Sequence, residues 1–108
     1  MSAALVGELR SHRPPIVLAQ EGAGSISVRV QAAEMWDAIR VTAHPDTVVS
    51  ELKQRVVNEF FPGHAYADDF VLKLRGWEML DEQQSIRVGG IMDGSIVLLA
   101  RRRRRPVR

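Results

Sequence analysis

Alternating polar and apolar residues predict two neighbouring strands in the first half of the chain. Residues 25–31 alternate strictly and carry β-branched side chains on one face, which is typical of a strand with one buried side. A second alternating run, 36–42, places Ile39 and Val41 on one face and Trp36 on the other. Because only a short link separates the two runs, we expect an antiparallel hairpin, although no glycine marks the type of its turn.

An amphipathic helix is predicted directly after this hairpin. Pro45 ends the second strand because it lacks the amide hydrogen that a ladder requires, and either Asp46 or Thr47 can cap a helix over 48–61. Three- and four-residue spacing separates an apolar face from a polar one. The apolar face consists of Val49, Leu52, Val56 and Phe60, and the polar face of Glu51, Lys53, Gln54, Arg55 and Glu59.

Three later segments complete a predicted sheet. Residues 70–75 form a third strand that Gly76 closes, and residues 77–80 form a short edge strand. The apolar run 95–100 is typical of a strand covered on both faces, so we place it between the first strand and the third. The residues predicted to fill the core between sheet and helix are Ile26, Val28, Val30, Ile39, Val41, Val49, Leu52, Val56, Leu72, Leu74, Ile91, Val97 and Leu99.

Length and composition predict one small domain with two flanking segments. The chain has 108 residues, which corresponds to a single domain, here 25–100. The preceding leader, 1–24, lacks a sustained period and contains Pro14 and Pro15, so we expect it to be flexible. Its apolar residues leave a short strand or a packed turn open as alternatives. An arginine-rich tail, 101–108, follows the domain.

Charge is distributed unevenly between these parts. Residues 25–100 carry seven basic and eleven acidic side chains, a net charge of −4, whereas residues 101–108 carry +6. We therefore expect a basic surface of the kind that binds nucleic acid on the tail and none on the domain. The tail is predicted either to be solvated or to bind nucleic acid or another anionic surface weakly, through salt-dependent contacts with phosphate. Its candidate residues are Arg101, Arg102, Arg103, Arg104 and Arg105.

The sequence offers no pattern that predicts catalysis or cofactor binding. There is no cysteine, and His12, His44 and His64 lack the spacing of metal-ligand pairs. A phosphate-binding glycine loop and a nucleophile elbow are also missing. We expect a protein that is not an enzyme and uses no cofactor or metal. Because no apolar run approaches the ~20 residues of a membrane helix and the first residues make a poor secretory signal, a cytoplasmic monomer without a membrane span is expected.

Taken in order, these segments resemble the ubiquitin-like β-grasp family over roughly residues 25–104. The resemblance implies an α+β fold, in which one main helix packs across a mixed sheet of four to five strands. Family members are conjugated modifiers, sulfur carriers or noncovalent binding modules, so the implied partners are other proteins. The resemblance rests on the opening hairpin, Pro45-Asp46-Thr47-Val48, Leu52-Lys53 with Val56, Leu74-Arg75-Gly76, Leu80, Ile86, and Ile91 followed by Gly94-Ser95-Ile96-Val97-Leu98-Leu99.

The glycines depart from the pattern of a conjugated modifier. Modifiers and sulfur carriers of this family end in Gly-Gly, whereas no glycine follows Gly94 here, and Gly89 and Gly90 precede the last strand. The expected function is therefore that of a noncatalytic protein-binding module or adaptor, which acts by noncovalent contacts through its exposed sheet face. One alternative is a modifier, or its precursor, that is conjugated to target proteins. The second alternative is electrostatic binding of nucleic acid through the tail.

The resemblance also implies candidate binding residues. The recognition face of the family lies on the exposed side of the third and last strands. Lys73 stands where an aliphatic residue usually centres this face, which suits a partner that is both acidic and apolar. Trp77 follows Gly76, near this face, and is expected either to pack in the core or at the sheet edge or to contact the partner. The candidate protein-binding residues are Val71, Lys73, Gly76, Trp77, Leu98 and Ala100.

Overall fold

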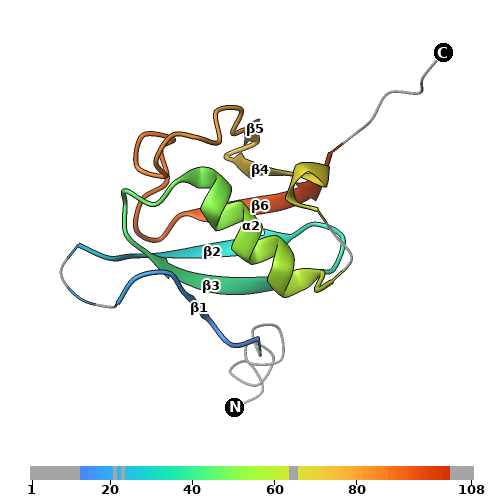
Figure 1. Cartoon of the computed structure of the whole chain (residues 1–108), viewed down its shortest axis with the longest axis horizontal. Helices are drawn as coiled ribbons and strands as arrows, with labels where there is room; N and C mark the ends of the chain where they lie inside the picture. Colours follow the sequence, from blue (N-terminus) through green and yellow to red (C-terminus); the bar gives the residue numbers. More distant parts are fainter. Residues whose placement is uncertain (1–12, 21, 23, 64–65, 103–108) are drawn as a thin grey trace.

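In the part of the chain that the structure describes, one long helix crosses one face of a six-stranded mixed sheet (Figure 1). The structure is a computed structural model that describes residues 13–20, 22, 24–63 and 66–102. The helix, α2, covers Val49–Phe60, and a short 3₁₀ helix, η1, covers Ala67–Asp69. The strands are β1 (Ile16–Val17), β2 (Ile26–Ala32), β3 (Asp37–Ala43), β4 (Phe70–Leu74), β5 (Trp77–Glu78) and β6 (Ile96–Arg101).

The sheet has the strand order β1-β3-β2-β6-β4-β5 (Figure 1). The hairpin β2–β3 is antiparallel, β6 lies parallel to β2 and antiparallel to β4, and β1 runs parallel to β3. The last strand is therefore central, as its apolar run predicts. The α+β prediction is confirmed. The predicted edge strand is present as β5, and the sheet has one strand more than the predicted four to five because β1 adds a short strand beside β3.

The core lies between the sheet and α2. The core residues that alternation and helical spacing predict are buried, except Ile26 and Leu74, which pack against the core while half-buried. Ile26 is the first residue of β2 and Leu74 is the last residue of β4, so both lie at the edge of the core. Phe70, Met79 and Ile86 add to the same cluster from β4 and the segments after it.

The leader prediction requires a correction over residues 13–20, because β1 is part of the sheet. Ile16 is 4% exposed and packs in the core, whereas Val17 is 56% exposed. The guanidinium of Arg13 forms an ion pair with Asp37, donates to the carbonyl of Glu59 at 3.2 Å and lies 4.8 Å from the ring centroid of Phe60. The rest of the predicted leader, residues 1–12, 21 and 23, lies outside the described residues, as do His12 and His64.

The start of α2 differs from the predicted capping by Asp46 or Thr47. The N-cap residue is Val48, and no side chain caps the helix. Instead, the amide of Val49 donates to the carbonyl of Gln84 at 2.9 Å, and the amide of Ser50 donates to that of Glu82 at 2.8 Å. Backbone carbonyls from a distant segment thus satisfy amides that a local side chain usually satisfies.

Lys53 is a second correction within α2, because it is buried rather than on the polar face. Its side chain is 1% exposed, and its Nζ donates to Glu82 Oε2 at 2.7 Å and to the carbonyl of Phe70 at 3.1 Å. Position 53 lies four residues after Val49 and three before Val56, in the middle of the buried stripe. Helical geometry alone therefore places it inward, and the two oxygens compensate its charge.

The boundary of the tail also moves. Arg101 is the last residue of β6 and pairs with Phe70. Its guanidinium donates to both carboxylate oxygens of Glu34 at 3.2–3.4 Å and lies 4.9 Å from the Phe70 ring centroid. The amide of Arg102 donates to the carbonyl of Asp69 at 2.7 Å. Arg101 and Arg102 therefore belong to the folded domain, and Arg103, Arg104 and Arg105 lie outside the described residues.

Candidate functional site: the uncovered sheet face

Alternate strand residues line the face of the sheet opposite α2, which we call the open face. No helix covers this face within the part of the chain that the structure describes (Figure 1). Strand register arranges its side chains in rows that cross the sheet. One row consists of Arg40, Arg29 and Ile96, and the next of Ala38, Gln31, Leu98, Lys73 and Glu78.

Three of the predicted binding residues come together on the open face. Lys73 and Leu98 are direct partners across β4 and β6, and Ala100 lies two residues beyond Leu98 on the same side. All three are partly exposed. Ile96, two residues before Leu98, is well exposed and extends the apolar strip along β6. The structure thus places an apolar strip beside a lysine, as the resemblance implies.

The other predicted residues lie elsewhere. Val71 is on the open face but only 4% exposed, so it offers little surface to a partner. Gly76 lies in the β4–β5 turn with a φ of 85°, a conformation that favours glycine. Trp77 is opposite Leu74, whose side chain packs on the helix side of the sheet, so Trp77 faces away from Lys73 and Leu98. It is 80% exposed and lines a separate hollow of about 440 Å³ with Leu80.

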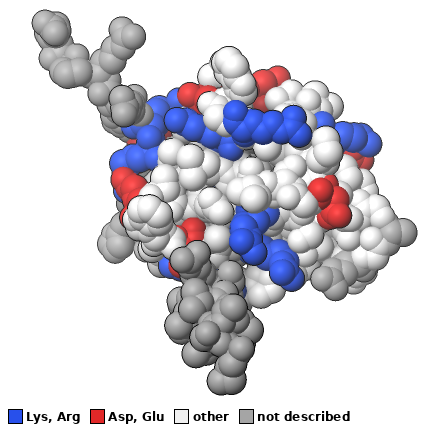
Figure 2. Space-filling view, turned by 180° about the vertical axis from the view of Figure 1, so that it is seen from behind, with Lys and Arg blue, Asp and Glu red and all other residues white. Residues whose placement is uncertain are grey.

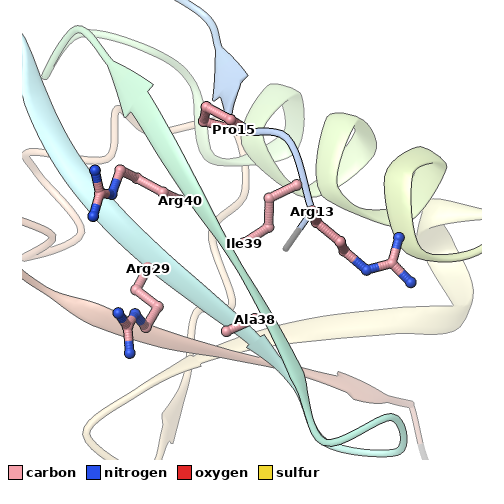
Figure 3. A pocket seen from close by; sticks show the side chains of 6 residues that line it. All are labelled: Arg13, Pro15, Arg29, Ala38, Ile39 and Arg40. Carbon is pink, nitrogen blue, oxygen red and sulfur yellow. The ribbon is translucent and has the colours of Figure 1, made fainter. Parts of the chain in front are cut away.

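Two arginines that no sequence motif marks dominate one end of the open face. Arg29 on β2 and Arg40 on β3 are direct cross-strand partners. Figure 3 shows both side chains extending from neighbouring strands away from α2, whereas Arg13 points towards the helix. Both line a hollow of about 200 Å³ that includes Pro15, and a second of about 260 Å³ that reaches Ile96. Alternation shows that each arginine points outward, but only the register brings them together.

An exposed tryptophan borders the same face. Trp36, in the β2–β3 turn, is 93% exposed and has a φ of 53°, which is unusual for a residue other than glycine. It lines a hollow of about 550 Å³ with Arg29, Ala38 and Leu98. The hollow therefore joins Arg29 to Leu98 of the apolar strip and is also lined by an aromatic side chain.

The open face is locally cationic although the domain carries a net negative charge. Several carboxylates are held in ion pairs, including Asp37 with Arg13, Glu34 with Arg101 and Glu78 with Arg102. Arg29, Arg40 and Lys73 form no ion pair or side-chain hydrogen bond with any described residue. Figure 2 shows this side of the molecule, with basic side chains spread across it and several acidic groups between and around them. A domain with net negative charge thus presents a locally cationic face.

The structure shows neither a metal cluster nor a membrane helix among the residues it describes. No three His, Asp or Glu side chains there are grouped in a way that could hold a metal ion. No described helix is both long and apolar enough to cross a membrane.

Comparison with known proteins defines the fold. No protein-family model and no curated protein sequence matches this chain. Among solved structures, ubiquitin from Caldiarchaeum subterraneum is 17% identical, with a TM-score of 0.63 over 74% of this chain and 96% of that one. The ubiquitin-like domain of Plasmodium falciparum Dsk2 is 22% identical, with a TM-score of 0.60 over 72% and 99%.

A third solved structure extends the likeness to a domain of a larger protein. The C-terminal ubiquitin-like domain of human 2'-5'-oligoadenylate synthetase-like protein is 17% identical, with a TM-score of 0.64 over 82% of this chain and 95% of that one. The order of the strands, the single helix and these likenesses together show that the chain has the ubiquitin-like β-grasp fold.

Proposed function

We propose that this protein is a noncatalytic binding module that contacts other proteins noncovalently through its open face. The observation that carries the proposal is the position of Leu98. This leucine lies in the middle of the uncovered sheet, partly exposed, with Lys73 on one side and Gln31 on the other. Two of the similar structures are ubiquitin-like domains described as parts of larger proteins, which is consistent with a binding role.

The open face has the composition of a small protein interface. Apolar residues at the centre of an interface supply burial, and charged residues around them select a partner by its potential. Here Leu98, Ile96 and Ala100 form the apolar strip, and Lys73 lies beside it. A partner with apolar side chains flanked by acidic ones complements this arrangement.

The positions of Gly89 and Gly90 favour noncovalent binding over conjugation through this glycine pair. Both precede β6, so cleavage after Gly90 would remove the central strand. Gly90 has a φ of 96°, a backbone conformation that favours glycine, whereas a Cβ on Gly89 would meet the flexible end of the Met79 side chain. Backbone conformation thus accounts for Gly90 without a role in processing.

The test compares two leucine-to-aspartate variants of the full chain. Leu98→Asp places a charge in the apolar strip and should abolish capture of specific partners from a lysate of the source cells. Leu80→Asp makes the same change at a leucine that is 82% exposed and lines the hollow beside Trp77, and it should leave capture intact. Circular dichroism and thermal melting establish that both variants are folded.

Two results would contradict the proposal. If folded Leu98→Asp captures every partner as the parent chain does, the open face is not the binding surface. If incubation with ATP and activating enzymes from the source cells yields an adenylate or a larger covalent product, the protein is a modifier.

A further inference from the structure

We infer that Arg29 and Arg40 form an anion site that binds carboxylate side chains of an acidic peptide segment in the partner. The inference rests on the proposed protein-binding function and adds a second contact to it. Both arginines are direct cross-strand partners and line the same two hollows. In Figure 3 their guanidinium groups extend from the same side of the β2–β3 hairpin.

The two guanidinium groups are available to a ligand. Neither forms an ion pair or a side-chain hydrogen bond with any residue that the structure describes. Arg13, which lines the hollow at Pro15, is instead bound to Asp37 and to the carbonyl of Glu59. Each free guanidinium offers parallel N–H donors that match the two oxygens of a carboxylate.

The arginine pair carries a cost for stability that a ligand would remove. Like charges directly opposite each other across two strands destabilise a hairpin. A carboxylate bound between Arg29 and Arg40 would convert this repulsion into two attractive contacts. Replacing either arginine by glutamine should consequently leave the fold at least as stable as that of the parent chain.

The surroundings of the pair favour a short acidic segment of a protein over a long polyanion. Trp36 and Leu98 line the hollow that Arg29 shares, so an apolar side chain can bind next to the carboxylate. Asp37 lines that same hollow. The carboxylate of Asp93 accepts a hydrogen bond from the amide of Ser27, a residue that lines the hollow of about 260 Å³. Because Asp37 is already paired with Arg13, Asp93 is the carboxylate that would repel a nucleic-acid strand continuing past the arginines.

The test measures binding of labelled synthetic peptides to the full chain by fluorescence anisotropy. The probe is a short peptide of alternating glutamate and leucine, and its control replaces every glutamate by glutamine. The parent chain should bind the glutamate peptide more tightly. Arg29→Gln and Arg40→Gln should each weaken this binding about tenfold, as expected for loss of a charge-assisted hydrogen bond. Arg55→Gln, at an exposed position on α2, should have no effect.

Several results would overturn the inference. Equal binding of the two peptides by the parent chain is one, and failure of the parent chain to bind the glutamate peptide is another. A folded double variant, Arg29→Gln with Arg40→Gln, that binds the glutamate peptide as tightly as the parent chain would also overturn it. Tighter binding of a single-stranded oligonucleotide that depends on Arg29 and Arg40 would identify nucleic acid as the occupant instead. If natural partners are lost in Leu98→Asp but retained in the double variant, the proposed function stands and the anion site fails.

Discussion

At the scale of single residues, Lys53 shows how a charged side chain becomes part of the core. Its methylene chain lies in the buried stripe of α2, and its ammonium group reaches Glu82 and the carbonyl of Phe70. Glu82 also accepts the amide of Ser50 through its backbone carbonyl. One lysine thus links the helix to β4 through Phe70 and to the loop after β5 through Glu82.

Replacing Lys53 should destabilise the fold substantially. Lys53→Met keeps most of the side-chain volume but leaves the buried carbonyl of Phe70 and the Glu82 carboxylate without their donor. We expect a loss of roughly 3 kcal/mol in the free energy of unfolding, at the lower end for breaking a buried pair because Glu82 can still reach water. Urea denaturation measures this loss.

The matched control for Lys53 is on the same helix. Arg55→Met makes a similar change at an exposed position and should shift stability by no more than about 0.5 kcal/mol. Equal effects of the two substitutions would show that Lys53 is solvated and does not hold the helix against β4.

At the scale of elements, β1 and α2 both depend on segments far away in the sequence. The two-residue strand β1 is held by parallel pairing with β3, by Ile16 in the core and by the contacts of Arg13 with Asp37 and Phe60. The first amides of α2 are satisfied by carbonyls of the loop that includes Glu82. The sequence of β1 has no local signal strong enough to define this strand, whereas spacing predicts α2 and only the satisfaction of its first amides depends on distant residues.

The packing of β1 can be tested with two neighbouring residues. Ile16→Ala should cost about 2 kcal/mol in the free energy of unfolding, because it creates a cavity under the edge of the sheet. Val17→Ala, whose side chain faces outward, should cost less than about 0.5 kcal/mol. Chemical denaturation of both variants measures the difference, and indistinguishable values would mean that β1 does not contribute to the core.

At the scale of the whole molecule, charge is separated by the fold as well as by the sequence. The domain is acidic overall, yet the strand register places Arg29, Arg40 and Lys73 on the open face. Near the end of β6, Arg101 and Arg102 are held by Glu34, Glu78 and the carbonyl of Asp68. These contacts engage both guanidinium groups and make them less available to a polyanion.

Two truncations separate folding from polyanion binding. A chain that ends at Ala100 loses the contacts of Arg101 and Arg102 and should lose about 1–2 kcal/mol of stability, whereas one that ends at Arg102 should be as stable as the full chain. Any binding of single-stranded DNA by the full chain should be weak and fall with salt, with a log–log slope of roughly −2 to −3. The chain that ends at Arg102 should lose this DNA binding. If the shorter chain still binds DNA, the DNA-binding residues lie in the domain.

The sequence by itself determined the elements and the core of this protein. Alternation in 25–31 and 36–42, the spacing of Val49, Leu52 and Val56, and the apolar run before Arg101 define the hairpin, the helix and the central strand. These features are local and periodic, so they predict the same strands and helix in any fold that buries one face of each element. The same alternation places Lys73 and Leu98 on the exposed side.

Only the tertiary structure decided which distant residues meet. The register of β2 against β3 makes Arg29 and Arg40 neighbours, and the pairing of β5 with β4 turns Trp77 away from Leu98. The core recruits Ile16 and Lys53 because groups distant in the sequence complete their burial and their hydrogen bonds. Such contacts depend on register and on long-range packing, and a one-residue shift in strand pairing would change them all.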